Sequence, residues 1–208
     1  MTDLEQRLTS LPDGAAQLDL DRLQAELARR AARAGILDVA YAGADSPLGE
    51  LTIFVTPRGV VRVAYENEPD DLLFEELSDG VSPRLLRDPR RTDAARAEIE
   101  DYFEGRRRTF DLPIDWSLVH GFAVGVLQAT ARVPFGEVSS YGEVAAEAGS
   151  PRAARAAGNA LASNPIPIVV PCHRVLHAGG GLGGYTGGLD RKRFLLTLEG
   201  ALAPGVDR

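Results

Sequence analysis

The stretch from Asn164 to Val175, Asn-Pro-Ile-Pro-Ile-Val-Val-Pro-Cys-His-Arg-Val, decides how the rest of the chain is interpreted. It holds the only cysteine of the 208 residues, Cys172, so this thiol has no disulfide partner in the chain and serves packing or reactivity. Three prolines fix φ and remove backbone donors, so the run before the thiol is expected to be extended and stiff, and not a regular central strand. A lone cysteine is more often an inert small hydrophobe, but the adjacent His173 and the pliable glycines of 179–188 favour a reactive thiol.

The composition is that of an ordinary globular protein, with 44% apolar and 25% charged residues in a length that suits one domain or two small ones. No apolar run approaches the about 20 residues that span a bilayer. The acidic, polar N-terminus is no secretory signal, so a cytoplasmic protein that contacts no membrane is expected.

The net charge of -7 argues against binding of nucleic acid, because phosphate is bound by Lys and Arg side chains. The charge is unevenly distributed, however: residues 1–116 carry 15 basic and 24 acidic side chains (net -9), whereas 117–208 carry 8 and 6 (net +2). The later part is therefore the candidate for DNA binding, with a modest and salt-sensitive affinity.

The first half of the chain is expected to contain a helical extension, 1–37, and an α+β scaffold domain, 38–116. In the extension, a helix from about residue 20 to 34 ends at Gly35, and Leu20, Leu23 and Leu27 are interpreted as the face that packs on the chain's own domain rather than on a partner. In the scaffold, residues 39–65 alternate as a β-hairpin around the turn 57–59. A helix follows over 93–103, and the triple arginine 106–108 is interpreted as its solvated end.

The second half, 117–208, is expected to be a mostly helical domain. Residues 122–131 predict one helix, and residues 140–148, a turn at 149–150 and residues 151–162 predict a helix-turn-helix. The last of these helices is rich in alanine and projects Arg152 and Arg155. So thin a helix can approach another surface closely, and tight packing against another helix is nearly as good an explanation.

Pro-Cys-His-Arg-Val, preceded by Asn-Pro-Ile-Pro-Ile-Val-Val and followed by Gly-Gly-Tyr-Thr-Gly-Gly-Leu at 183–189, resembles the active-site signature of the O6-alkylguanine-DNA alkyltransferases. The similarity extends from about residue 40 to 200 and includes Ser-Pro-Leu-Gly at 46–49. It implies a ribonuclease H-like first domain and a second domain with a helix-turn-helix. It also implies irreversible, single-turnover transfer of an alkyl group from O6-alkylguanine in double-stranded DNA to Cys172, by a protein that is a monomer in solution. The alkyl donor is the substrate, so no cofactor is expected, and no metal ligands are expected either.

The resemblance also assigns catalytic roles. Cys172 is the nucleophile, because a thiolate is the strongest soft nucleophile among side chains. His173 is its base, acting through a water, and Glu199 orients that base. Asn164 ties the helix-turn-helix to the thiol segment, and Tyr141 donates a hydrogen bond to the departing guanine. From the residues alone, Glu199 is equally a surface acid, Asn164 a turn former and Tyr141 a core tyrosine.

For DNA and substrate, the resemblance places Arg155 in the gap that a flipped base leaves when the protein binds the minor groove. Ala154 and Gly158 allow close approach, and Arg152 contacts phosphate. The expected substrate pocket comprises Tyr141, Tyr185, Thr186, Val175 and Pro167. Tyr185 and Thr186 form a lid, which Gly184 makes more mobile.

Three other functions compete with this one. A metal site would use Cys172, His173 and His177, although a closed zinc site would need carboxylates as well. A Cys-His hydrolase would share the activated thiol but would not explain the alanine-rich helix with its arginines. A non-catalytic protein that senses alkylguanine in DNA is the third alternative, and proteins of that class lack this cysteine.

Overall fold

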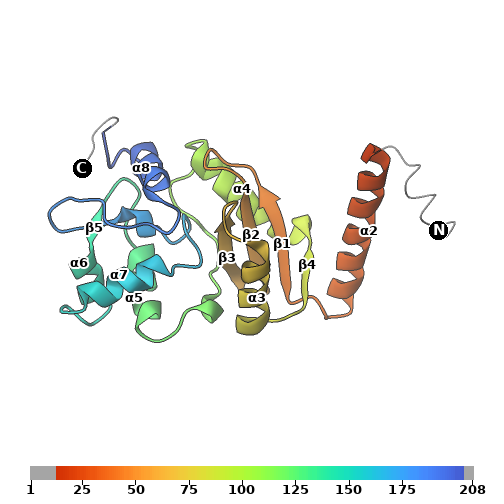
Figure 1. Cartoon of the computed structure of the whole chain (residues 1–208), viewed down its shortest axis with the longest axis horizontal. Coiled ribbons are helices and arrows are strands. Elements are labelled where there is room, and N and C mark those ends of the chain that lie inside the picture. The colour runs from red at the N-terminus through yellow and green to blue at the C-terminus, as the bar shows by residue number, and fades with distance from the viewer. Residues whose placement is uncertain (1–12, 204–208) are drawn as a thin grey trace.

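The computed structural model describes residues 13–203, and within the first helix it describes the side chains of residue 20 and of residues 22 onward. A small sheet with helices lies in the middle of the molecule, a second domain lies at one end, and one long helix stands at the other end (Figure 1). The predicted α+β first domain and mostly helical second domain are both present.

The sheet of the first domain is mixed. It comprises β1 (Val39–Ala44), β2 (Leu51–Thr56), β3 (Gly59–Tyr65) and β4 (Leu85–Arg87), in the order β3-β2-β1-β4. The predicted hairpin is β2-β3, and β1 pairs with β2 antiparallel and with β4 parallel. Gly59 is required at the turn, because a Cβ there would lie 2.1 Å from the Pro113 carbonyl oxygen. The sequence did not predict β4, which is only three residues long.

Two helices cover the two faces of this sheet. Helix α3 (Asp70–Gly80) buries Leu73 and Leu77 on one face, and α4 (Pro89–Phe103) buries Ala95, Ile99 and Tyr102 on the other. Helix α4 begins four residues before the predicted start. Pro89 suits the first helical position, and the Asp88 side chain accepts a hydrogen bond from the Arg90 N–H.

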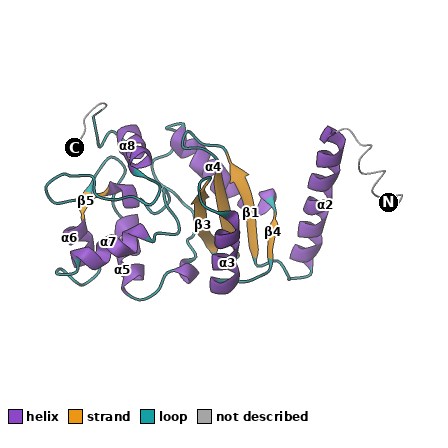
Figure 2. Ribbon diagram, viewed as in Figure 1, coloured by secondary structure: helices purple, strands orange, loops and turns teal. Residues whose placement is uncertain are grey.

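In its described part, which ends at residue 203, the second domain contains short helices and a single pair of two-residue strands (Figure 2). Its elements are η1 (Trp116–Leu118), α5 (Phe122–Ala131), β5 (Ser139–Ser140), α6 (Tyr141–Glu147), α7 (Ala154–Ala162), η2 (Cys172–Arg174), β6 (Val175–Leu176) and α8 (Leu189–Leu198). Helix α6 starts at a capping box in which Ser140 and Glu143 bond each other's backbone N–H groups.

Two predictions about local structure in this domain are wrong. Helix α7 starts at Ala154, so Arg152 lies in the turn before it rather than on the helix. The segment between Asn164 and Cys172 is buried as a series of turns instead of an extended run, because Val169 and Val170 donate to carbonyls two and four residues back. Ile168 there has φ 73°, a costly conformation for a β-branched residue.

In the first described helix, α2 (Asp13–Arg33), the leucines do not pack as predicted. Leu20, Leu23 and Leu27 are 53%, 66% and 55% exposed, whereas Ala28 and Ala31 are buried. The helix contacts the domain at β4, the short strand at the edge of the sheet. The alanine face is the one that approaches it, so the leucine stripe is left in solvent.

Candidate active site

The thiol lies at the start of η2, beneath the turns that follow Asn164. Cys172 is 5% exposed, and the Asn164 side-chain amide donates to its Sγ at 3.1 Å and to the Val170 carbonyl at 2.9 Å. The same side chain accepts a hydrogen bond from the Ile166 N–H at 3.0 Å. Asn164 therefore shapes the segment before the thiol and contacts the sulfur directly, which is more than a simple turn former does.

Burial raises the pKa of the Cys172 thiol to about 11, although the hydrogen bond from Asn164 and the charge of Lys192 act in the opposite direction. The thiol is therefore neutral near pH 7. A nucleophilic role requires a base that removes its proton when the substrate is in place.

His173 has the properties of such a base. Its ring is fully buried, and Nε2 lies 3.0 Å from Glu199 Oε1. Burial holds the pKa of His173 below its ordinary value despite the opposing effect of Glu199, so the imidazole is neutral near pH 7. A neutral ring that donates from Nε2 keeps its lone pair on Nδ1. Within residues 13–203, this buried nitrogen has no protein hydrogen-bond partner.

Glu199 is buried and receives hydrogen bonds from three side chains. Besides His173, Arg174 donates from Nε and Nη2, each at 2.8 Å, and the Tyr102 hydroxyl donates at 2.7 Å. Burial alone would raise the pKa of Glu199, but the bonds from His173 and Arg174 outweigh it and lower the pKa to about 2. Glu199 is thus a buried anion in direct contact with His173, and not a surface acid.

A cavity of about 580 Å³ opens above the thiol. The residues that line it are Tyr141, Ala154, Arg155, Gly158, Leu161, Ala162, Cys172, His177, Gly184, Tyr185 and Thr186. Most of the predicted pocket and DNA-contacting residues are therefore brought to one place. Val175 and Pro167 are not among them, because both are buried away from the cavity surface, and neither is the exposed Arg152.

Helix α7 forms one wall of the cavity. Ala157 and Ala160 on one side are buried in the core, whereas Arg155 is exposed at the cavity and Gly158 lies beside it. Packing thus explains one face of this thin helix, and its other face is open at the cavity.

Comparison with known proteins identifies the family. The family model for the 6-O-methylguanine DNA methyltransferase, ribonuclease-like domain, matches residues 39–116, and the model for the DNA binding domain of the same methyltransferase matches residues 121–201. The chain belongs to the 6-O-methylguanine DNA methyltransferase family.

Individual relatives of this methyltransferase family agree over most of their length. A methylated-DNA–protein-cysteine methyltransferase of Mycobacterium bovis is 39% identical over 164 residues, which are 79% of this chain and 94% of the relative. The inducible enzyme of Bacillus subtilis is 36% identical over 153 residues, 73% of this chain and 85% of its own. The crystal structure of Mycobacterium tuberculosis O6-methylguanine methyltransferase superposes with a TM-score of 0.67 at 37% identity, covering 81% of this chain and 96% of that one.

Three buried residues of the site were not predicted from the sequence. Arg174 belongs to the same Pro-Cys-His-Arg-Val motif, which was the available signal. Tyr102 lies 97 positions from Glu199, and nothing in the sequence joins them. Lys192 is fully buried, its Nζ donates to the Val175 carbonyl at 2.7 Å, and burial lowers its pKa to about 8.

Two further findings concern metal binding and membrane spanning. Among residues 13–203, no group of three or more His, Cys, Asp or Glu side chains is arranged to hold a metal ion. Over the same part of the chain, none of the helices has the length and apolar character needed to cross a bilayer.

Proposed function

We propose that this protein repairs DNA by irreversible transfer of an alkyl group from O6-alkylguanine to Cys172, one group per molecule, as a methylated-DNA–protein-cysteine methyltransferase (EC 2.1.1.63). Its membership of the family supports this function, and relatives carry that name over most of the chain. The observation that carries the proposal is a thiol that lines a cavity while an adjacent neutral imidazole is held by a buried carboxylate.

The proposed reaction follows from these contacts. His173 accepts the thiol proton at Nδ1 through a water, and Glu199 stabilises the imidazolium that forms. The thiolate attacks the alkyl carbon, an S–C bond forms, the C–O bond breaks, and its electron pair goes to the guanine. The proton returns by way of solvent to the guanine ring, so the products are a thioether and an unmodified guanine. The thioether has no good leaving group, which makes the transfer single-turnover.

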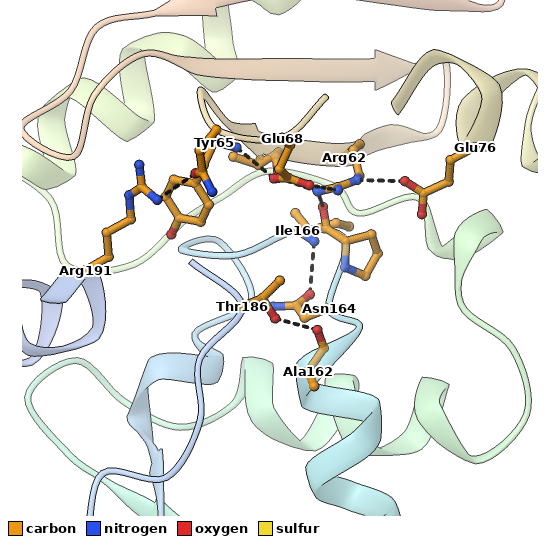
Figure 3. Close-up of polar contacts among 12 residues, drawn as sticks. Arg62, Tyr65, Glu68, Glu76, Ala162, Asn164, Ile166, Thr186 and Arg191 are labelled. Carbon is orange, nitrogen blue, oxygen red and sulfur yellow. Dashed lines mark hydrogen bonds and ion pairs between the residues drawn. The ribbon is translucent and has the colours of Figure 1, made fainter. Parts of the chain in front are cut away.

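Tyr141 is proposed to assist departure of the guanine. Burial raises the pKa of its hydroxyl, which therefore stays protonated and stabilises the leaving guanine as a hydrogen-bond donor. In this proposal Tyr185 and Thr186 form the lid of the pocket. The Thr186 hydroxyl donates to the Ala162 carbonyl, which fastens this lid to the end of α7 (Figure 3).

DNA is proposed to bind at α6 and α7, acting as a helix-turn-helix within a DNA-binding and transfer domain of residues 117–208, with residues 38–116 as scaffold. The exposed Arg155 at the cavity supports a role in replacing a flipped base, and Ala154 and Gly158 leave room for a backbone to approach. Arg152, in the turn, is proposed to contact phosphate. A solved relative is the Mycobacterium tuberculosis protein in complex with DNA. We further propose a monomer located in the cytoplasm.

The decisive experiment is the intact mass of the protein after mixing it with an equimolar duplex that contains one O6-methylguanine, followed by peptide mapping. We expect a gain of one methyl group on Cys172 that stops at one per molecule. The Cys172→Ala variant should bind the duplex and gain nothing. Tight binding of the lesion by the wild-type protein without a mass change would instead support the non-catalytic sensor.

A further inference from the structure

The cavity wall that contains Tyr185 is supported by a residue of the other domain. Tyr65, the last residue of β3, is 3% exposed, and its hydroxyl lies 2.8 Å from the hydroxyl of Tyr185. Tyr185 in turn lies edge-on to the ring of His173, with ring centroids 6.5 Å apart, and lines the cavity beside Cys172. Tyr185 therefore contacts Tyr65 of the first domain and the ring of His173, and it lines the cavity that is proposed to hold the substrate.

Tyr65 is itself held on two sides. The Arg191 guanidinium, from α8, lies 4.5 Å from the centre of its ring, and Arg191 also donates to the Asn67 side chain at 2.7 Å. The Tyr65 N–H donates to Glu68 at 2.8 Å (Figure 3). Such contacts from both domains leave the Tyr65 ring little freedom to move.

The same strand end also fixes the segment that precedes the thiol. Arg62, paired with Glu68 and Glu76, donates to the Pro165 carbonyl at 3.3 Å, and the Val63 N–H donates to the same oxygen at 2.9 Å (Figure 3). Pro165 directly follows Asn164, whose amide contacts the thiol. The end of β3 is thus docked on both the lid and the segment that carries the nucleophile.

The glycine at position 187 shows how closely the two tyrosines are packed. A Cβ at Gly187 would lie 2.7 Å from the Tyr65 ring and 2.8 Å from the Tyr185 ring. Contacts that short do not occur, so a side chain at 187 would push the rings apart. The pairing of the two rings depends on this glycine.

We propose that Tyr65 is a positioning residue for alkyl transfer, which holds Tyr185 against the cavity and so favours small alkyl groups over large ones. The inference rests on the proposed function and adds a residue of the scaffold domain to it. Burial raises the pKa of both hydroxyls, so the two groups meet as neutral partners in a single hydrogen bond.

Removing one hydroxyl of this pair leaves the other without its hydrogen-bond partner. In a Tyr65→Phe variant, the Tyr185 hydroxyl has no acceptor or donor at this position, so its ring gains freedom to turn. A bulky alkyl group fits only if the Tyr185 ring moves aside. A methyl group, in contrast, reacts only if this ring holds the alkylated guanine in place. Loosening the wall should therefore slow methyl transfer and spare benzyl transfer.

The test compares single-turnover transfer from the same duplex carrying either O6-methylguanine or O6-benzylguanine. We expect Tyr65→Phe to raise the benzyl-to-methyl rate ratio about fivefold, the effect of one neutral hydrogen bond. In a Tyr185→Phe background the same substitution should change the ratio by less than about twofold, because the hydroxyl pair is already broken. Tyr41→Phe is the matched control, since that ring packs against Phe54 and Phe74 beneath α3 on the other face of the sheet.

Each outcome is informative. If both rates fall equally while the melting temperature drops, Tyr65 only stabilises the fold, and the inference is wrong. Additive effects of the two substitutions would also contradict it, because they would show that the hydroxyls do not act as a pair. Absence of methyl transfer by the wild-type protein would refute the proposed function and the inference with it.

Discussion

The two sides of Cys172 are built in opposite ways. Below the sulfur, His173, Arg174, Glu199 and Tyr102 form a buried polar floor in which the carboxylate receives hydrogen bonds from all three partners. Above it, α7 presents alanine, glycine and one exposed arginine to an open cavity. The residues proposed to activate the thiol are thus in the core, where a substitution also affects folding. The residues proposed to contact DNA are on the surface, where a substitution changes stability little.

Glu199→Gln should give the largest effect, because it removes the anion from the floor and leaves Arg174 charged and buried. We expect the rate of transfer from free O6-benzylguanine to fall about 100-fold, since base catalysis is lost. The melting temperature should fall as well. Both are measured against Glu137→Gln, an exposed glutamate of the same domain. A Glu199→Gln variant with the wild-type rate and melting temperature would show that Glu199 contributes neither to the reaction nor to stability.

Arg155→Ala should affect only the cavity side of Cys172, where DNA is proposed to bind. Repair of O6-methylguanine in duplex DNA should slow about tenfold, the usual effect of losing one stacking side chain. The reaction with free O6-benzylguanine should stay within about twofold of wild type, since no base has to be replaced. If both reactions slow together, Arg155 supports the structure of the cavity rather than the contact with DNA.

Acid should destabilise the protein, because His173 and Glu199 of the floor bind protons more readily in the unfolded chain. Below the ordinary His pKa of 6.5, the unfolded chain binds a proton at His173 that the folded, buried ring resists, so stability present at pH 7 is lost as pH falls. Glu199, with its pKa lowered from 4.5 to about 2, adds the same dependence between those values.

Thermal denaturation at a series of pH values checks this dependence. Arg155→Ala should follow the wild-type curve, because its side chain lies outside the floor. Glu199→Gln should lose less stability than wild type below pH 4.5, where the wild-type carboxylate begins to resist protonation. A melting temperature that stays constant from pH 7 to acid would contradict the assignment of His173 as a buried neutral base.

Leu23→Ser in α2 should give the smallest effect and supplies the baseline for the others. The side chain is 66% exposed, so the free energy of unfolding should change by less than about 0.5 kcal/mol and transfer should be unchanged. Chemical denaturation measures the first quantity and the single-turnover assay the second. A large loss of stability would mean that the leucine stripe is covered in solution.

Elements with a regular pattern and clear boundaries could be predicted from the sequence. The β2-β3 hairpin has a turn between β-branched runs, and α5 has the predicted ends, 122 and 131. One prediction that failed depended on tertiary contacts. The face of α2 that packs is set by the edge of the sheet, where alanines fit closer than leucines. The start of α4 failed for a different, local reason, because the cap at Asp88 and Pro89 was a signal in the sequence that the prediction did not use.

The site residues also divide into those that the sequence could predict and those that depend on the folded chain. Cys172 and His173 are adjacent, so one motif reveals both. The contact between His173 and Glu199 joins residues 26 positions apart and exists only in the folded chain. Lys192 lies between two arginines in a helix and looks like a surface residue, yet it is fully buried. Periodicity does not indicate which charged side chain of such a helix turns inward.

The burial of Cys172 has a consequence for the working life of the molecule. A nucleophile that is consumed by one reaction is also lost to any oxidant or stray electrophile that reaches it first. Peroxides and small alkylating agents react with accessible thiolates, whereas Cys172 is 5% exposed and burial raises the pKa of its thiol to about 11. Burial and the raised pKa therefore slow the reaction of Cys172 with such reagents, although the thiol lines a cavity, and more molecules keep their single reactive thiol for a lesion.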